Sequence, residues 1–372
     1  MSGSRFGKNF TMTTWGESHG PGVGAVVDGC PAGVALSLRD LQKDMERRRP
    51  GASPFSTQRK EKDEVRILSG VFHGKTTGTP ISLLIENLDQ RSEDYDELSQ
   101  IYRPGHADYT YDQKYGIRDY RGGGRASGRE TAARVAAGAV AKAFLRELRV
   151  QVQAYTVAIG NTRVDRARVD LAEAAENPFY MPDKLAYEQA KAEAENAIQE
   201  GDSLGGVVEC LVSGLKSGVG EPVIEKLQAV LGMAIFSIGA VKGLEFGAGF
   251  SAAEKKGSEN NDAMLVENGR LIKQSNHAGG SYGGISDGSA LIFRAAFKPT
   301  PSIAKTQQTI NSQRENVRIS VKGRHDPLIV PRAVVVVEAM AAAALADLIL
   351  QSLSSRLDVI QKIYGEGILC SS

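Results

Sequence analysis

All five histidines stand beside turn-forming residues, at His19, His73, His106, His277 and His325. A histidine can gain or lose a proton near neutral pH, and glycines beside it let main-chain N–H groups approach a ligand closely. A single loop histidine is more often solvated than catalytic. The shared setting, rather than any one residue, therefore indicates acid–base chemistry on a small molecule.

Arginines form the second group with chemical potential. They are dense in Arg-Gly-Gly-Gly-Arg-Ala-Ser-Gly-Arg-Glu-Thr at 121–131, and an arginine triplet at 47–49 ends a predicted helix. Ser127 and Glu130 form an S-x-x-E capping box, which places several arginines at a helix N-terminus, the end that attracts anions. The guanidinium fork grips phosphate or carboxylate in a bidentate way. The sequence therefore predicts a ligand with several negative charges.

A loop at 298–302, Lys-Pro-Thr-Pro-Ser, adds hydroxyl and ammonium donors held by two prolines. No metal is expected, because there is no His-Glu-x-x-His, no paired cysteine and no histidine pair at helical spacing. The phosphate-binding P-loop is absent. Two Gly-x-Gly-x-x-[Gly/Ala] matches, at 20–25 and 247–252, lack the strand–turn–helix setting of a dinucleotide site.

Composition limits the class of protein. The chain has 372 residues, of which 41% are hydrophobic and 24% charged, with a net charge of +1. No broad basic field is expected, so we predict no nucleic-acid partner. Three widely spaced cysteines suit a reducing cytoplasm. The most apolar stretch, 333–350, contains Glu338 and Asp347, which favours a buried helix over a membrane span.

The elements that must position these groups do not alternate regularly between strand and helix. This pattern favours one α+β domain over residues 1–372 rather than a doubly wound parallel sheet. A polar excursion is expected at 253–275, where apolar anchors are few. The predicted strands are 23–27, 65–72, 80–86, 150–159, 207–212, 240–246, 290–297 and 317–322, and the predicted helices are 38–49, 131–148, 183–200, 221–238 and 332–353.

Taken together, the motifs resemble the chorismate synthase family. In family order the chain carries GESHG at 16–20, RRRPG at 47–51, RPGHADYTYDQKYG at 103–116, RDYRGGGRASGRET at 118–131, QSNHAGG at 274–280, GGIS at 283–286, KPTPS at 298–302 and KGRHDP at 322–327. Eight motifs in order span nearly the whole chain.

The resemblance implies a β–α–β sandwich, a helical layer between antiparallel sheets, assembled as a homotetramer. It implies a carbon–oxygen lyase that removes phosphate and a C6 hydrogen from 5-enolpyruvylshikimate 3-phosphate by 1,4-anti elimination, giving chorismate for aromatic amino acid biosynthesis. It also implies reduced FMN as an obligatory cofactor, which either NADPH on the protein itself or an external reductase would keep reduced.

Family roles carry over residue by residue. His19 would protonate the departing phosphate with Ser18 beside it, His106 would act on the reduced flavin, and Asp326 with the flavin N5 would help remove the C6 proton, assisted by Ser127. The substrate would contact Ser18, His19, Arg48, Arg103 and Arg129, and Arg48 would also contact NADPH. FMN would contact Arg125, Ala126, Ser127, Gly239, Ala240, Gly283, Lys298, Pro299, Thr300, Pro301, Ser302 and Arg324.

Two departures from the family pattern affect these contacts. Relatives often carry Asn where this chain has Gly239, so a flavin contact there would come from the main chain. Many have Arg where this chain has Pro54, so the resemblance does not carry over a two-arginine contact with NADPH in this loop. The alternative enzyme is an FMN-dependent oxidoreductase or flavin reductase, which would not need the arginine-rich pocket. An RNA-binding module would need more exposed aromatics than a 6% content supplies.

Overall fold

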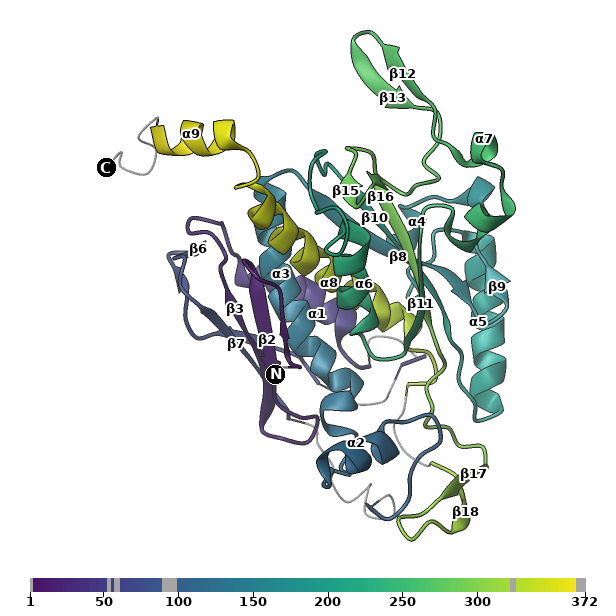
Figure 1. Cartoon of the computed structure of the whole chain (residues 1–372). Helices are drawn as coiled ribbons and strands as arrows, with labels where there is room; N and C mark the ends of the chain where they lie inside the picture. Colours follow the sequence, from purple (N-terminus) through teal and green to yellow (C-terminus); the bar gives the residue numbers. More distant parts are fainter. Residues whose placement is uncertain (1–2, 52–54, 57–60, 89–98, 322–325, 366–372) are drawn as a thin grey trace.

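A computed structural model describes residues 3–51, 55–56, 61–88, 99–321 and 326–365. Two five-stranded antiparallel sheets lie on opposite sides of a layer of helices (Figure 1). The first sheet, in the order β1-β2-β3-β7-β4, consists of β1 (Arg5–Phe6), β2 (Thr11–Trp15), β3 (Gly22–Asp28), β7 (Ile81–Glu86) and β4 (Val65–Ile67). The small hairpin β5 (Val71–Phe72) and β6 (Lys75–Thr76) extends from it.

The second sheet has the order β11-β16-β10-β8-β9. Its strands are β11 (Val241–Phe246), β16 (Leu291–Phe297), β10 (Gly206–Ser213), β8 (Gln151–Ile159) and β9 (Thr162–Arg163). Alternation along β16 buries Leu291, Phe293, Ala295 and Phe297 on the face toward the helices. This period of two is the pattern of a strand packed on one side.

The helical layer contains α1 (Leu38–Arg48), α3 (Thr131–Glu147), α6 (Leu227–Phe236) and α8 (Val330–Ser352). α3 packs on α8 and on the first sheet, while α8 packs on the second sheet. The two helices approach closely because both are alanine-rich, and Gly138 has no room for a side chain. A Cβ there would lie 2.3 Å from the Cβ of Ala339. The predicted fold class and β–α–β arrangement are confirmed.

The remaining elements lie outside the three layers. They are α2 (Asp108–Tyr115), α4 (Glu173–Glu176), α5 (Lys184–Gln199), α7 (Gly257–Asn260), α9 (Leu357–Gly365) and the hairpins β12 (Met264–Glu267) with β13 (Arg270–Lys273), β14 (Ser281–Tyr282) with β15 (Ile285–Ser286) and β17 (Gln307–Ile310) with β18 (Asn316–Ile319). The predicted polar excursion at 253–275 contains α7 and the hairpin β12–β13, which projects from the body (Figure 1).

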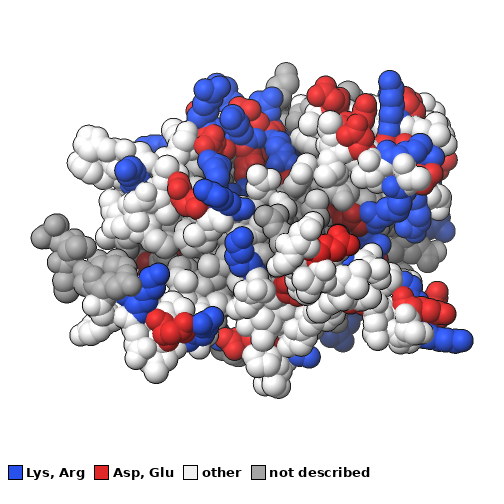
Figure 2. All heavy atoms as spheres, turned by 90° about the horizontal axis from the view of Figure 1, so that it is seen from above, with Lys and Arg blue, Asp and Glu red and all other residues white. Residues whose placement is uncertain are grey.

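Helix α8 is long and apolar enough to cross a membrane, but 94% of its most apolar window is buried inside the protein. Glu338 explains how a charge is tolerated there. It accepts from both terminal nitrogens of Arg47 at 2.7 and 2.9 Å and from Lys142 at 2.5 Å. α8 is therefore a core helix, as predicted. On the face shown in Figure 2, the acidic and basic side chains of the described residues are interspersed.

Candidate active site

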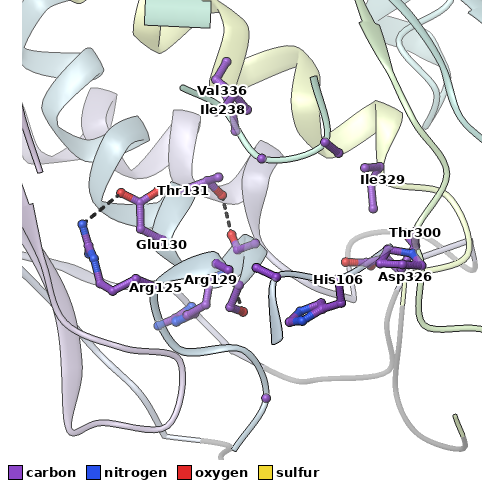
Figure 3. Close-up of a pocket in the computed structure, with 18 of the residues that line it drawn as sticks. His106, Arg125, Arg129, Glu130, Thr131, Ile238, Thr300, Asp326, Ile329 and Val336 are labelled. Carbon is purple, nitrogen blue, oxygen red and sulfur yellow. Dashed lines mark hydrogen bonds and ion pairs between the residues drawn. The ribbon is translucent and has the colours of Figure 1, made fainter. Parts of the chain in front are cut away.

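A cavity of about 830 Å³ lies at one end of the helical layer, where α3 and α8 begin. Both halves of the chain line it. The first half supplies residues from the segments 103–107 and 122–131. The second half supplies 237–240, residues from the segment 297–302, and the start of α8. Figure 3 shows His106, Arg129 and Arg125 along one side and the apolar Ile238 and Val336 across from them. Two helix N-termini therefore meet at one hollow, an arrangement that favours anions.

The charged lining is predominantly basic. Eight Lys and Arg residues but only three Asp and Glu residues line the cavity among the described residues. The acidic ones are Glu61, Glu130 and Asp326. The basic ones are Arg48, Arg103, Lys114, Arg125, Arg129, Arg134, Lys298 and Arg332. Local clustering thus produces the anion-attracting site that a net charge of +1 does not suggest.

The glycine triplet at 122–124 separates two histidines. A Cβ on Gly122 would lie 2.4 Å from Cε1 of His19, and one on Gly123 would lie 3.2 Å from Nε2 of His106. Both glycines have positive φ, 77° and 156°. Glycine is therefore required here for close approach, and for its backbone angle at Gly122. The loop therefore lies against both His19 and His106.

His106 is held from behind by a carboxylate. Its Nδ1 lies 2.9 Å from Oδ1 of Asp108, and Arg103 binds the same carboxylate through Nε and Nη2, each at 2.8 Å. Burial would raise the pKa of Asp108, but Arg103 and His106 outweigh it and hold that pKa far below its usual range. We therefore assign the Nδ1 proton to the bond with Asp108. That leaves Nε2 on the side of Gly123 and the cavity.

Arg48 and Arg129 share a second buried carboxylate. Asp63 accepts from Nε of Arg48 at 3.0 Å and forms ion pairs with the terminal nitrogens of both arginines. Arg129 also donates to the side-chain oxygen of Asn87 at 2.7 Å and to the carbonyl of Glu86 at 3.0 Å. The predicted substrate arginines are thus fixed in place by protein contacts. Burial lowers the pKa of Arg48 to about 10.

The predicted helix start at Ser127 is present, but the reciprocal capping box is wrong. Ser127 Oγ accepts from the N–H of Arg129 at 3.3 Å and caps a 3-10 turn, Gly128–Glu130, that leads into α3. Glu130 does not return to Ser127. Its carboxylate accepts from Thr14 at 2.8 Å and from Arg134 at 2.6 Å. Thr14 and the charged Arg134 take up the Glu130 carboxylate, so only the Ser127 hydrogen bond of the capping box forms.

Arg125 and Ala126 line the cavity from this same loop. The guanidinium of Arg125 reaches across to the first sheet, where it donates to the Thr14 hydroxyl at 2.7 Å and to the Gly16 carbonyl at 3.1 Å. It thereby ties the glycine loop to the strand that precedes Ser18 and His19. Figure 3 shows Arg125 beside Glu130 at this side of the cavity.

The second half of the chain supplies Gly239, Ala240, Lys298, Thr300, Pro301 and Ser302 to the cavity wall. The amide of Lys298 donates to the carbonyl of Ala240 at 2.9 Å, so the two loops are joined. A Cβ on Gly239 would meet nothing within 4 Å, which leaves its main chain open. Thr300 Oγ1 is buried without a hydrogen-bond partner in the described part of the chain. Asp326 pairs with Arg332 at the same side.

Several predicted residues lie elsewhere. Ser18 and His19 are buried, 3% and 4% exposed, and lie behind Gly122 rather than in the cavity lining. Pro299 is not a lining residue either. Gly283 connects β14 and β15 and is not brought to this cavity. Arg324 and Pro54 lie outside the described residues, as does His325.

Sequence reasoning missed the carboxylates that hold the arginines. Asp63 stands in Glu-Lys-Asp-Glu, which has the pattern of a solvated charged run, and only the fold buries it. Asp108 had a usable signal, since it follows His106 by two residues inside a recognised motif. Arg332, in the first turn of α8, also lines the cavity, and its Nε donates to the carbonyl of Arg48 at 2.8 Å.

A helical layer between two antiparallel sheets, with a basic cavity at its end, defines a β–α–β sandwich protein suited to a small anionic ligand. The family model described as chorismate synthase matches residues 10–350. The chorismate synthase of Lachnoclostridium phytofermentans is 59% identical over 365 residues, covering 98% of this chain and all of that protein. That of Lachnospira eligens is 57% identical over 364 residues, with the same coverage.

A solved structure is also similar. A crystal structure of chorismate synthase has a TM-score of 0.75 and 31% sequence identity, and the match covers 97% of each chain. The chain belongs to the chorismate synthase family. It is an enzyme of the lyase class, and the expected family resemblance is confirmed.

Proposed function

We propose that this protein converts 5-enolpyruvylshikimate 3-phosphate to chorismate by a 1,4-anti elimination that depends on reduced FMN, within the route to aromatic amino acids. The observation that carries the proposal is the basic cavity, in which family-motif residues from distant parts of the chain meet. A substrate with a phosphate and two carboxylates matches a wall of fixed guanidinium forks. Family membership supports the particular reaction.

The residues present fit a flavin phosphate cofactor. A volume of about 830 Å³ lies within the range of small-molecule sites. Burial and the nearby Lys242 lower the pKa of Lys298, and among the described residues no carboxylate forms an ion pair with it. Thr300 has unused hydrogen-bonding capacity. Lys298, Thr300 and Ser302 would hold FMN with Arg125, Ala126, Ser127, Gly239, Ala240 and Pro301, and Pro299, Gly283 and Arg324 remain proposed contacts. Reduced FMN, when bound, would donate electron density that eases departure of the phosphate.

On the acid side, His19 protonates the departing phosphate. Its Nδ1 lies 3.1 Å from Ser18 Oγ, so the hydroxyl and the ring form a pair that can pass a proton. The ring reaches the cavity only across Gly122, where no side chain intervenes. Arg48, Arg103 and Arg129 bind the substrate's anionic groups nearby. The protein's contribution is positioning and stabilisation of charge.

On the opposite side, Asp326 takes part in removal of the C6 proton, with Ser127 in the relay. Arg332 pairs with Asp326 and fixes its carboxylate. Figure 3 shows Asp326 among the residues of the cavity wall. His106 exchanges a proton through Nε2, which faces the cavity, while Asp108 orients the ring through Nδ1. The proposed acid and base come from distant parts of the chain, since His19 lies between β2 and β3 and Asp326 precedes α8.

We also propose that residues 1–372 form a single domain, that the protein works in the cytoplasm as a homotetramer, and that NADPH, in contact with Arg48, supplies electrons to the flavin. Neither a nucleic acid nor a membrane is a proposed partner. A single unfolding transition by calorimetry would support the single domain, and sedimentation velocity would measure the tetramer.

The experiment that tests the reaction is an anaerobic assay of chorismate formation. Dithionite-reduced FMN should support turnover, oxidised FMN alone should not, and addition of NADPH to oxidised FMN tests the reductant. The rival flavin reductase predicts NADPH oxidation without phosphate release. Failure of reduced FMN to support chorismate formation would overturn the proposal.

A further inference from the structure

Asp63 has no part in the proposed chemistry, yet it contacts two arginines of the cavity wall. We propose that Asp63 is a positioning residue that holds Arg48 and Arg129 side by side as one anion-binding unit. This inference rests on the proposed function of the cavity. The side chains of Arg48, Arg129 and Asp63 are 0%, 5% and 0% exposed, so water screens none of these charges.

Three separate segments meet at this carboxylate. Arg48 ends α1, Arg129 lies in the 3-10 turn before α3, and Asp63 precedes β4. One oxygen of Asp63 faces Arg48 and the other faces Arg129. Two buried guanidiniums repel each other, and a shared counter-charge between them removes that repulsion. The geometry therefore assigns the spacing of the two forks to Asp63.

The same carboxylate keeps Arg48 protonated. Burial lowers the pKa of Arg48 to about 10, Arg332 and Arg129 act in the same direction, and Asp63 opposes them. Without the charge of Asp63 the pKa of Arg48 falls further below its usual range. Arginine loses its charge as pH rises through its pKa, so an uncharged residue at 63 brings alkaline loss of anion binding to lower pH.

The backbone conformation at Asp63 determines which substitution can test the role of its carboxylate. Its φ is 52°, in the left-handed region that most side chains avoid and that Asp and Asn adopt more readily. Asp63→Asn keeps both the shape and the backbone preference, removes the charge, and replaces one of the two acceptor oxygens by an amide group that cannot accept from an arginine. Asp63→Ala would add backbone strain and confuse the two effects.

The matched control is Glu209→Gln on the outer part of the second sheet. Glu209 is also buried, 3% exposed, and it also holds an arginine, Arg166, at 2.6 Å, together with the hydroxyl of Tyr155 at 2.7 Å. It does not line the active cavity. Arg166 is half exposed, so loss of the charge at Glu209 reports what removal of a buried carboxylate from an ion pair does to the fold alone.

The experiment measures KM for 5-enolpyruvylshikimate 3-phosphate, kcat and melting temperature, anaerobically with excess reduced FMN, between about pH 6.5 and 9.5. Asp63→Asn should raise KM about tenfold, the usual scale for loss of a group that orients direct ligand contacts. The increase should grow with pH more steeply than in the wild type, while kcat changes much less. Glu209→Gln should lower the melting temperature and leave KM and its pH profile unchanged.

A wild-type KM and pH profile in Asp63→Asn would overturn the proposal, whatever its melting temperature. If Asp63→Asn does not fold, the double variant Asp63→Asn/Arg48→Gln is compared with Arg48→Gln. A higher KM in the double variant supports positioning of Arg129, and equal KM values overturn it. If the wild type proves inactive, the proposed reaction fails separately. Calorimetric binding of inorganic phosphate then tests Asp63, with weaker binding expected in Asp63→Asn and equal binding contradicting the inference.

Discussion

Gly122 lies against the imidazole of His19, and Gly123 lies against that of His106. In the sequence these glycines lie close to arginines, and the pattern indicates an anion-binding loop. In the structure they also set the distance between two candidate acids. A side chain at either position would occupy space that now belongs to an imidazole ring.

Gly122→Ala tests this arrangement. A Cβ there would lie 2.4 Å from Cε1 of His19, so the ring must move, and we expect kcat to fall by on the order of 10²-fold, the scale of losing a positioned acid. Gly74→Ala is the control for backbone strain, because its φ of 74° nearly equals the 77° of Gly122 and a Cβ there meets nothing within 4 Å. Equal losses of activity in the two variants would show that strain alone matters.

The histidines themselves give a second test. His19→Ala should slow phosphate release by about 10²–10⁴-fold with flavin binding intact, whereas His106→Ala should change the absorbance spectrum of bound reduced FMN. His73→Ala is the control, because His73 is exposed in the turn between β5 and β6. Single-turnover kinetics and flavin spectra separate the variants. Similar effects at all three positions would contradict the assignment.

Motifs in the sequence identified the cationic and acid–base side chains of the site. They did not identify the carboxylates that bind and position those side chains. His106, Arg103 and Arg129 lie in motifs rich in glycine and charged residues, which indicate a ligand-binding site. Asp63 belongs to a charged run whose burial depends on contacts with segments 15 and 66 residues away, at Arg48 and Arg129. Long-range partners of this kind leave no local pattern.

At the scale of elements, strands and helices with a clear period were predicted well. β3, β7, β8, β10 and β16 lie where alternating or β-branched runs predicted them, and α3 and α8 lie within two residues of their predicted starts. The helix predicted at 221–238 begins only at Leu227, since Pro222 and Val223, whose φ is 67°, form a turn. α2 was missed because its apolar residues do not gather on one face.

The close packing of α3 on α8 can be tested at Gly138. Alanine there would place its Cβ 2.5 Å from Cα of Ala339, so the helices must separate, at a cost of about 1–3 kcal/mol that outweighs the gain in helix propensity. In Gly232→Ala, within α6, the nearest atom would lie 3.8 Å away. That control should be neutral or stabilising by up to about 1 kcal/mol. Urea denaturation measures both, and a stable Gly138→Ala protein would contradict the packing.

At the scale of the whole molecule, one buried charge network ties the layers together. Glu338 of α8 contacts Arg47 of α1 and Lys142 of α3, and it accepts from the amide of Ala154 in β8 at 2.9 Å. Burial alone would raise the pKa of Glu338, but Lys142 and Arg47 outweigh it and lower the pKa to about 2. This carboxylate therefore stabilises the fold above about pH 4.5, and the contribution is lost as pH falls toward 2.

Glu338→Gln should accordingly destabilise the protein by about 3–5 kcal/mol at pH 7, because two buried cations lose their partner. The difference from the wild type should shrink as pH falls from 4.5 toward 2. Asp358→Asn, in an exposed pair with Arg356, is the control and should cause no measurable change. A difference in unfolding free energy that does not vary with pH would show that Glu338 is not the titrating group.

The proposed reaction eliminates phosphate without net oxidation. The ratio of phosphate, chorismate and oxidised flavin formed by the whole protein tests this most directly. Wild-type protein is given substrate in large excess over dithionite-reduced FMN under strictly anaerobic conditions, and phosphate, chorismate and oxidised flavin are measured together. An elimination without net oxidation should give one phosphate per chorismate, many turnovers per flavin and no accumulation of oxidised FMN. One oxidised flavin per product, or flavin oxidation without phosphate release, would contradict it and identify an oxidoreductase instead.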